Sequence, residues 1–263
     1  MILACFVGLT VGLDAKFVTI KAGTYRVGKS DRLYRPVYQV KLKSFQLSAF
    51  ELTNAEFESF VLATHYRTDA ERLHNAMVFE PGLKEFRWIH DKTAFWRFPN
   101  GVTRGGIVDK MNHPVTSISF RDALAYCKWA KVRLPSLDEW EVACRAGTTT
   151  DYFFGNDTKD IGKFANVWHG RDHLKPDTSD GYLYTSPAGS FLPNSWGLYD
   201  MYGNVFEFCS GRVEGDRRST TRHSRGGSWW CSKNSCCFFN SVDIGSVNER
   251  ASFSNQGFRV VRL

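Results

Sequence analysis

The residues of this chain whose types could do chemistry gather in one irregular segment near its C-terminus. Arg225-Gly226-Gly227-Ser228-Trp229 precedes this segment and Gly257-Phe258-Arg259-Val260-Val261 follows it. Residues 234–248 have neither a helical nor a strand period, yet paired cysteines and paired phenylalanines occupy positions 236–239. Loops usually lie at the surface, so thiols and rings there favour a contact surface or a lined pocket. The sequence therefore predicts a binding segment that the rest of the chain holds in place.

Cysteine and histidine spacing does not by itself predict a metal cluster. The cysteines number seven, an odd count that excludes a complete intrachain disulfide framework, and no Cys-x-x-Cys pair supports a zinc ribbon. His113 precedes Pro114, which favours a turn or core position. His169 and His173 fall in a polar stretch without a partner at metal-ligand spacing.

Composition predicts a folded, aromatic-rich chain. Of its 263 residues 43% are hydrophobic and 15% aromatic, enough for the core of one large domain or two small ones. The net charge is +7, and the basic residues are scattered except between Arg212 and Arg225. We interpret that cluster as a solvated loop rather than a phosphate site, so no nucleic-acid partner is expected.

Strands open the scaffold and three helices follow. Residues 17–28 read as a strand, a glycine turn and a second strand, and residues 37–50 as another strand. Thr53 with Glu56 predicts a capped helix to about Ala63. Ser119 begins a second helix. Ser136 begins a third, which Gly147 ends.

Irregular structure fills most of the remainder. Residues 66–112 alternate aromatic and charged residues, which favours a long segment packed by its own rings. After residue 148 no helix is predicted. The fold class is therefore α+β, with few helices and much irregular structure.

The N-terminal segment, residues 1–16, leaves two readings open. Its apolar start is too short to span a bilayer and lacks the basic residues of a secretory signal. Ile2-Leu3-Ala4-Cys5 resembles the end of a bacterial lipoprotein signal, whose cysteine is lipidated. Either residues are missing upstream, or this is a buried first strand. The first reading implies a bacterial cell-surface or periplasmic protein that meets the membrane only through a lipid anchor.

Several motifs in order resemble the formylglycine-generating enzyme (sulfatase-modifying factor) family. They cover residues 17–263, which we treat as a single domain, and imply a variant of the C-type lectin fold. The motifs are residues 17–28, Glu51 to Phe57, His113-Pro114-Val115, Asp122 to Cys127, Arg133 to Glu141, Gly197 to Phe208, Arg225 to Trp229 and Gly257-Phe258-Arg259.

The resemblance implies two function classes, of which the first is an oxidase that converts a sulfatase cysteine to formylglycine. Similar enzymes hold copper(I) between two cysteines five residues apart, and Cys231 and Cys236 match them. Thiolates are the soft ligands that copper(I) prefers. Ser228 and Asn255 match positions near that active site.

Departures from the family pattern surround this cysteine pair. Ser232 replaces a histidine, Ser235 a tyrosine, Ile244 an arginine and Phe206 a tryptophan. Two family disulfides are excluded, because the partners of Cys127 and Cys144 would be Val260 and Ser241. A catalytically dead regulator of a sulfatase is a third, weaker reading.

The second class, variable proteins of diversity-generating retroelements such as a treponemal lipoprotein, matches these departures better. Their diversified positions exclude Lys, Glu, Gln, Met and Trp, and residues 234–248 contain none of the five. We therefore expect a monomeric, non-enzymatic protein that binds a protein or cell-surface ligand through a variable region at about 230–256. The expected solvent-exposed patch is Trp230, Cys231, Ser232, Asn234, Ser235, Cys236, Phe238, Asn240, Val242, Asp243, Ile244, Ser246, Asn248, Phe253, Ser254 and Asn255.

Calcium is the second metal that the resemblance implies. Two sets of oxygen donors match family calcium sites, and hard oxygen ligands suit Ca²⁺. The expected role is structural, to fix long loops that lack regular hydrogen bonding. The sets are Asn166, Val167, Asp180 and Tyr182, and Asp200, Gly203, Val205 and Glu207.

Overall fold

The computed structural model describes residues 16–32, 35–211, 220–234, 236 and 239–263. Its short helices and strands are joined by long irregular segments, which confirms the predicted α+β class. Among the described residues, no helix combines the length and apolar character needed to cross a bilayer. The lipoprotein-like segment around Cys5 lies outside them, and lipid anchoring stays a prediction.

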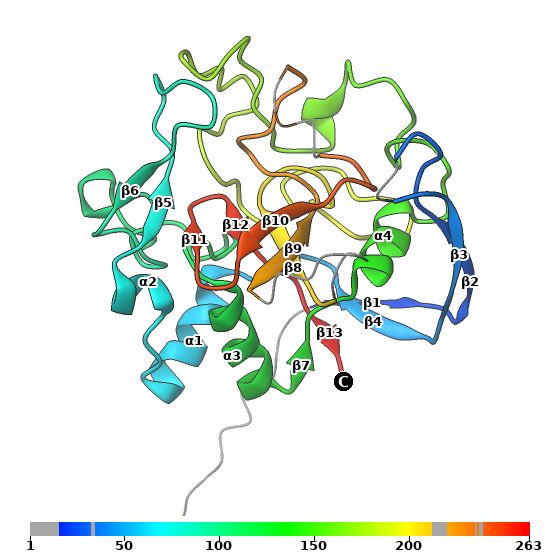
Figure 1. Cartoon of the computed structure of the whole chain (residues 1–263), viewed down its shortest axis with the longest axis horizontal. Helices are drawn as coiled ribbons and strands as arrows, with labels where there is room; N and C mark the ends of the chain where they lie inside the picture. The colour runs from blue at the N-terminus through cyan, green and yellow to red at the C-terminus, as the bar shows by residue number, and fades with distance from the viewer. Residues whose placement is uncertain (1–15, 33–34, 212–219, 235, 237–238) are drawn as a thin grey trace, which may run out of the picture.

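A sheet near the centre of the molecule contains the start of each of two motifs, Arg225–Trp229 and Gly257–Val261, which we call the first and second C-terminal frames. It has the order β10-β9-β8-β12, with β8 at Phe206–Cys209, β9 at Thr221–Arg225, β10 at Gly245–Asn248 and β12 at Gln256–Gly257. Strand β9 runs antiparallel to both β8 and β10, and β12 runs parallel to β8. This sheet therefore fixes both ends of the segment that contains the cysteine pair (Figure 1).

A second four-stranded sheet joins the start and end of the described chain. Its order is β1-β4-β13-β7, from Phe17–Ile20, Phe45–Ser48, Val261–Arg262 and Val132–Arg133. The hairpin of β2, Gly23–Val27, and β3, Tyr38–Leu42, lies beside α4 (Figure 1). The strand predicted over residues 37–50 is thus two strands, β3 and β4, which belong to different sheets.

A small third sheet brings the aromatic segment to the C-terminal one. Strand β11, Ser252–Phe253, pairs in parallel with β5, Ala76–Val78, which pairs antiparallel with β6, Ile89–Asp91. Residues 79–88 between β5 and β6 are therefore held next to residues 252–255. This pairing is the contact that builds the candidate site.

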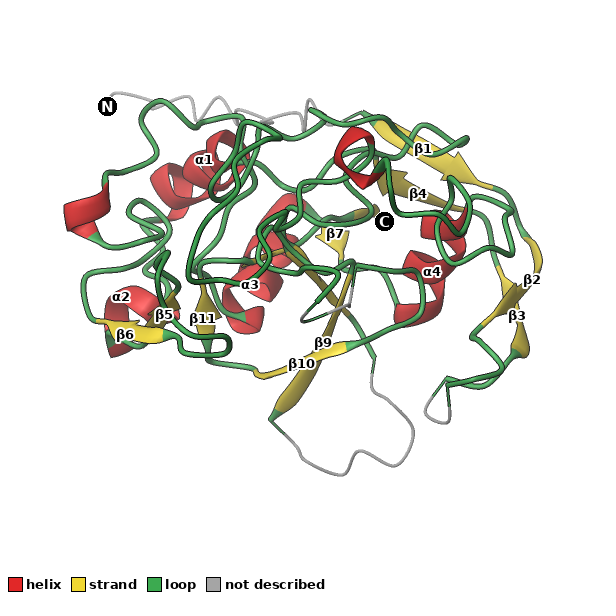
Figure 2. Cartoon of the chain, turned by 90° about the horizontal axis from the view of Figure 1, so that it is seen from above, coloured by secondary structure: helices red, strands yellow, loops and turns green. Residues whose placement is uncertain are grey.

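Side-chain capping begins each α-helix. The predicted helices are confirmed as α1, Asn54–Thr64, α3, Phe120–Ala130, and α4, Leu137–Arg145. Helix α2, Asp69–Leu73, lies in a region we expected to be irregular, although Thr68 and Glu71 form the same capping box. Figure 2 shows α1, α2 and α3 at one end of the molecule and α4 at the other. Short 3₁₀ turns lie at Val102–Arg104 and Ile161–Lys163.

Buried ion pairs tie α4 and the first C-terminal frame into the core. Glu141 of α4 accepts hydrogen bonds from Arg35, at 2.7 Å, and from Arg225, at 3.0 Å. Arg225 is fully buried, so the interpretation of this residue as part of a solvated basic loop is wrong. The rest of that loop, residues 212–219, lies outside the described residues. Cys127 and Cys144 are free and buried, as expected from their missing partners.

Candidate functional site

Cys231 and Cys236 lie where the first C-terminal frame meets the irregular segment. The backbone of Cys231 is held by two hydrogen bonds: its N–H donates to the Ser228 carbonyl, and its carbonyl accepts from the Trp168 N–H. Gly227 has a φ of +72°, and a Cβ there would come within 2.7 Å of the Phe239 backbone nitrogen. A glycine is thus required for the segment after Cys236 to pack against the frame.

The two thiols share a buried environment. Cys231 is fully buried, whereas Cys236 is half-buried and has a left-handed φ of 40°. Burial raises the pKa of the Cys231 thiol well above its ordinary value, and a hydrogen bond with Cys236 raises it further. Cys231 is therefore a protonated thiol at neutral pH unless a cation replaces its proton.

Ser228 and Asn255 form a buried polar pair next to Cys231. The Asn255 amide donates to Ser228 Oγ at 2.8 Å, and Ser228 Oγ lies 3.9 Å from Cys231 Sγ. Both residues match positions that the family resemblance placed near an active site. The structure brings them together with Cys231, although Asn255 is 27 positions away from Ser228 in the sequence.

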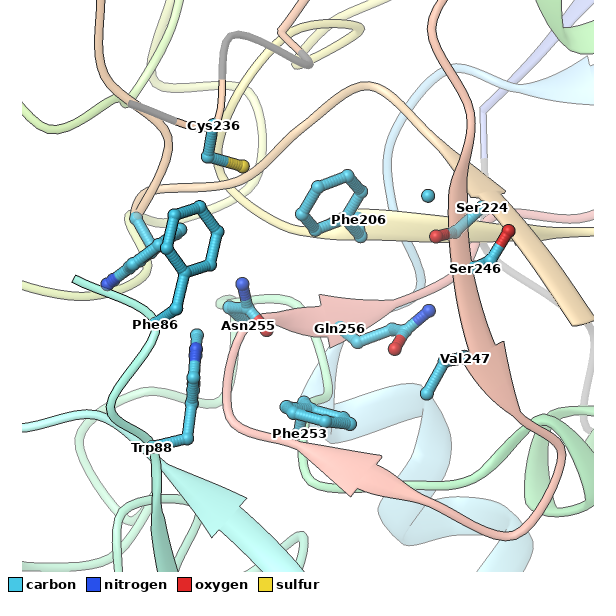
Figure 3. Close-up of a pocket in the computed structure, with 12 residues that line it drawn as sticks. Phe86, Trp88, Phe206, Ser224, Cys236, Ser246, Val247, Phe253, Asn255 and Gln256 are labelled. Atoms are coloured by element: carbon cyan, nitrogen blue, oxygen red, sulfur yellow. The ribbon is translucent and has the colours of Figure 1, made fainter. Parts of the chain in front are cut away.

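A pocket of about 230 Å³ opens beside Cys236. In Figure 3 the Cys236 sulfur points towards this space, with Phe86 and Trp88 on one side and Phe206 on another. None of the lining side chains that the structure describes carries a formal charge. They are Phe86, Trp88, Phe206, Ser224, Trp230, Cys236, Gly245, Ser246, Val247, Phe253, Asn255 and Gln256.

The expected solvent-exposed patch is largely wrong. Its exposed members are Asn234, Ser246 and Asn248, and its half-buried members are Cys236, Asn240, Ile244 and Phe253. Ser235 and Phe238 lie outside the described residues. The others are buried because they pack under the frames: Trp230, Cys231, Ser232, Val242, Asp243, Ser254 and Asn255.

Asp243 shows why the patch expectation failed. Its Oδ1 accepts from Arg32 Nε at 2.9 Å and its Oδ2 from Asn240 Nδ2 at 2.8 Å. These contacts use the polar side chains to stabilise the fold. A polar residue in an irregular segment therefore does not have to face solvent.

Phe86 and Trp88 are site residues that the sequence interpretation missed. We expected the aromatic residues of 66–112 to pack within their own segment, and the rings of Phe95 and Phe98 do so at 5.5 Å, whereas Trp96 packs on Phe57 of helix α1. Trp88, however, contacts Trp230 and Phe253 at ring distances of 5.7 and 5.4 Å. The pairing of β5 with β11 is not visible in the sequence, so no local signal could assign these rings to the site.

Among the described residues, the histidines belong to no metal cluster. Within the part of the chain that the structure describes, no three His, Cys, Asp or Glu residues are grouped to hold a metal. His113 is buried, as expected, and its Nδ1 lies 3.0 Å from Thr185 Oγ1. His173 does not lie in a polar loop as expected: it is buried and stacks against Trp168 and Trp230.

The two expected calcium sets differ in their free oxygens. Asp180 Oδ2 is buried without a hydrogen-bond partner, and so is Asp200 Oδ1. Glu207, in contrast, accepts from Trp140 and Arg259 at 2.6 Å through both oxygens. The first set thus offers a carboxylate oxygen that accepts no hydrogen bond, although it lies 3.4 Å from His169 Nε2. The second offers one from Asp200 but none from the Glu207 side chain.

The chain is similar to known proteins along its length. A family model described as "Sulfatase-modifying factor enzyme 1-like domain" matches residues 10–263. A formylglycine-generating enzyme from Mus musculus is 34% identical over 93% of this chain and 74% of its own length. One from Thermomonospora curvata is 33% identical over 92% and 91%. An inactive C-alpha-formylglycine-generating enzyme 2 from Bos taurus is 34% identical over 91% and 81%.

Solved structures share the fold. PvdO from Pseudomonas aeruginosa has a TM-score of 0.68 at 25% identity, over 94% of this chain and 93% of its own. Treponema denticola variable protein 1 has a TM-score of 0.65 at 17% identity, over 94% of each chain. At that identity the likeness to a variable protein concerns the fold alone, and diversification by a retroelement is not shown.

The expectation of a non-enzymatic protein is wrong. Relatives at 33–37% identity, over most of this chain, are named formylglycine-generating enzymes. The cysteine pair is retained although residues around Cys231 are replaced. Cys236 lines the pocket, and Cys231 is buried next to it rather than on an open surface.

Proposed function

Since the chain belongs to the family of sulfatase-modifying factor enzyme 1-like domains, we propose that it is a copper-dependent oxidase that converts a cysteine of a sulfatase to formylglycine. The observation that carries the proposal is the cysteine pair: Cys236 and Asn255 line the pocket, and the buried Cys231 contacts Cys236 and Ser228. A substrate peptide would enter this pocket with its own cysteine next to the pair.

The cysteine pair fits copper(I). Two adjacent thiols in an apolar, largely buried setting are soft donors, and thiolates select this ion over harder metals. When bound, copper(I) would supply a soft ligand site for the substrate thiolate and would pass electrons to dioxygen. An added thiol reductant would supply two electrons, so that the cysteine CH₂–SH becomes an aldehyde while its sulfur leaves as hydrogen sulfide and the second oxygen atom as water. A two-sulfur site does not need a third His, Cys, Asp or Glu from the protein.

The protein's own residues would position the pair and exclude water. Ser228 lies on the Cys231 sulfur and is itself oriented by Asn255, so the donor of Cys231 has a fixed surrounding. Trp230 is buried next to it and stacks on His173 at 4.3 Å, which keeps this wall rigid. Apolar rings around the thiols keep competing water away from the reacting sulfur.

Oxidation of a Cys-x-Pro-x-Arg peptide by copper-loaded protein tests the proposal. Formylglycine in the product, measured by mass spectrometry, is expected for the wild type and for Cys127→Ala, a buried thiol in helix α3. Cys231→Ser and Cys236→Ser should each abolish it. Absence of product from wild-type protein with stoichiometric copper would refute the oxidase, as would full activity of Cys231→Ser.

Calcium is a separate, structural part of the proposal. Asp180 Oδ2 accepts no hydrogen bond and lies 3.4 Å from His169 Nε2, a contact that a cation would replace. Asn166, Val167 and Tyr182 would be the further donors, as the family resemblance implies. The unpartnered Asp200 Oδ1 suits a second cation with backbone carbonyls of Gly203 and Val205, because Glu207 is engaged.

Chelation gives the measurement for calcium. We expect a chelator to lower the melting temperature of the wild type, and added Ca²⁺ to restore it. Asp180→Asn should shrink the shift, because it removes the charged donor. A melting temperature that is the same with chelator and with Ca²⁺ would contradict both sites.

A further inference from the structure

We propose that the pocket beside Cys236 is a specificity subsite for an uncharged, apolar side chain flanking the substrate cysteine, and that Phe86 is its specificity-determining residue. This inference rests on the proposed oxidase function. It deepens that function by naming the kind of peptide that the site prefers. The residues that form the subsite are far apart in the sequence, and the sequence alone did not indicate that they meet.

The pocket walls favour an apolar occupant. Phe86, Trp88 and Phe253 present rings to the space, and Val247 adds an aliphatic wall (Figure 3). Among the described residues that line the pocket none is charged, so a carboxylate or ammonium that entered would lose its hydration without gaining a counter-ion from them. Such a pocket excludes charged side chains more strongly than it attracts apolar ones.

Its size suits one side chain rather than a whole ligand. The volume of about 230 Å³ is below the roughly 300–1,000 Å³ of pockets that enclose small molecules. It lies directly beside Cys236, so a residue adjacent to the reacting cysteine of a peptide can reach it. The occupant that fits both facts is a large apolar side chain next to that cysteine.

Phe86 has the exposure and the backbone conformation expected of a residue that contacts a ligand. Its ring is 64% exposed, although it lies edge-on to Trp230 at 5.0 Å. Its φ of 59° is in the left-handed region, which a bulky residue adopts at a cost of about 1–3 kcal/mol. Apolar exposure and backbone strain at the rim of one pocket indicate a functional position rather than a packing one.

On the opposite wall this chain has a smaller side chain than the one usual in the family, which leaves more room in the pocket. Phe206 stands where a tryptophan is usual in that family, and a phenyl ring is smaller than an indole. Gly245 lies against this ring: a Cβ there would be 3.2 Å from Phe206 Cε1 and 2.8 Å from Ser224 Oγ. Both residues therefore keep the pocket open, and Phe206→Trp should narrow it.

Peptide binding tests the subsite without turnover. Fluorescently labelled Cys-x-Pro-x-Arg peptides would differ only at one residue flanking the cysteine, before or after it, with Phe, Leu, Ser or Asp there. Affinity for copper-free protein would be measured by fluorescence anisotropy under anaerobic, reducing conditions. At one of the two positions we expect Phe and Leu to bind at least about tenfold more tightly than Asp, a difference of about 1.4 kcal/mol.

Three variants assign the preference to the pocket. Phe86→Ala should reduce affinity for the Phe peptide about tenfold, in the range of one aromatic contact, while Phe86→Leu should keep most of it. Phe206→Trp should reduce binding of the Phe peptide more than that of the Ser peptide. Leu62→Ala, at 63% exposure on helix α1, is the matched control and should bind every peptide as the wild type does.

The outcomes separate this inference from the oxidase proposal. Equal affinity for Phe and Asp peptides at both positions, or a preference unchanged by both Phe86→Ala and Phe206→Trp, would overturn the subsite even if the peptides are oxidised. An apolar preference lost in Phe86→Ala would support it even if no peptide is oxidised. Circular dichroism of each variant would show that lost binding does not reflect unfolding.

Discussion

Burial alone does not distinguish the cysteines of this protein at the scale of single residues. Burial raises the pKa of the Cys127 and Cys144 thiols to about 12, and it raises the thiol pKa of Cys231 as well. Cys231 differs from the other two because a second thiol, Cys236, lies next to it and helps to raise its pKa. The first two are core residues, whereas Cys231 has a partner with which to bind a metal.

The raised Cys231 pKa predicts that copper(I) affinity increases with pH. Copper must displace the thiol proton, so below the thiol pKa the affinity should rise about tenfold per pH unit for each proton released. Competition with a chromogenic copper(I) chelator of known protonation between about pH 6 and pH 8 would measure this. Cys231→Ser should flatten the dependence and Cys127→Ala should leave it unchanged. A pH-independent wild-type affinity would show that the thiol is already ionised.

At the scale of elements, the helix N-termini depend on the most local interactions, between residues within one turn. In α4, Ser136 Oγ accepts from the Glu139 N–H at 3.1 Å, and Glu139 accepts from the Ser136 N–H at 2.8 Å. Glu139 also accepts two hydrogen bonds of 2.7 Å from Arg133, so the box is tied to strand β7. The Arg133 guanidinium lowers the pKa of Glu139 against the effect of burial.

Removal of the Ser136 cap should weaken the element but not the site. We expect Ser136→Ala to lower the free energy of unfolding by about 1 kcal/mol, since the Glu139 N–H loses its side-chain acceptor. Ser136→Asp, which can still accept, should lose much less. Urea unfolding followed by circular dichroism would measure both, and copper binding should be equal in the two variants. A loss equal in both would mean that the cap itself contributes little.

At the scale of the whole molecule, one buried arginine, Arg259, lies among three buried acids, Glu51, Asp200 and Glu207. Arg259 donates to both oxygens of Glu207 and to the Tyr199 carbonyl, and neither partner of the ion pair is exposed. Glu51 and Asp200 are buried in the same region. Burial raises the pKa of Glu51 well above its ordinary value and that of Asp200 to about 6, with repulsion between the acids adding to the Glu51 shift.

Arg259→Met should destabilise the protein by roughly 3–5 kcal/mol, because it leaves buried carboxylates without their cation. The loss should be largest above about pH 7. The folded-state pKa values lie above the unfolded ones, so lowering the pH through about 6 protonates the folded state first and stabilises it. Thermal unfolding in the presence of a calcium chelator, between about pH 5 and pH 8, would measure the difference from wild type. A deficit that grows towards low pH would contradict this account.

The sequence by itself determined the local elements and the class. Thr53, Ser119 and Ser136 marked the helices because a cap depends on residues within one turn. Thr68 and Glu71 carry the same signal, but α2 has only five residues, too few for an apolar period to support the assignment. The ordered family motifs predicted the fold class, since they cover the whole domain.

Only the tertiary structure decided which residues meet. The pairing of β5 with β11 places Phe86 and Trp88 at the same pocket as Cys236, and it joins segments far apart in the sequence. It was also the fold that buried Trp230 and Asp243, residues we expected at the surface. Irregular segments lack the periodicity that separates an inner face from an outer one, so their exposure depends on long-range packing. That is why the sequence indicated the chemistry of the thiols but not the pocket that Cys236 lines.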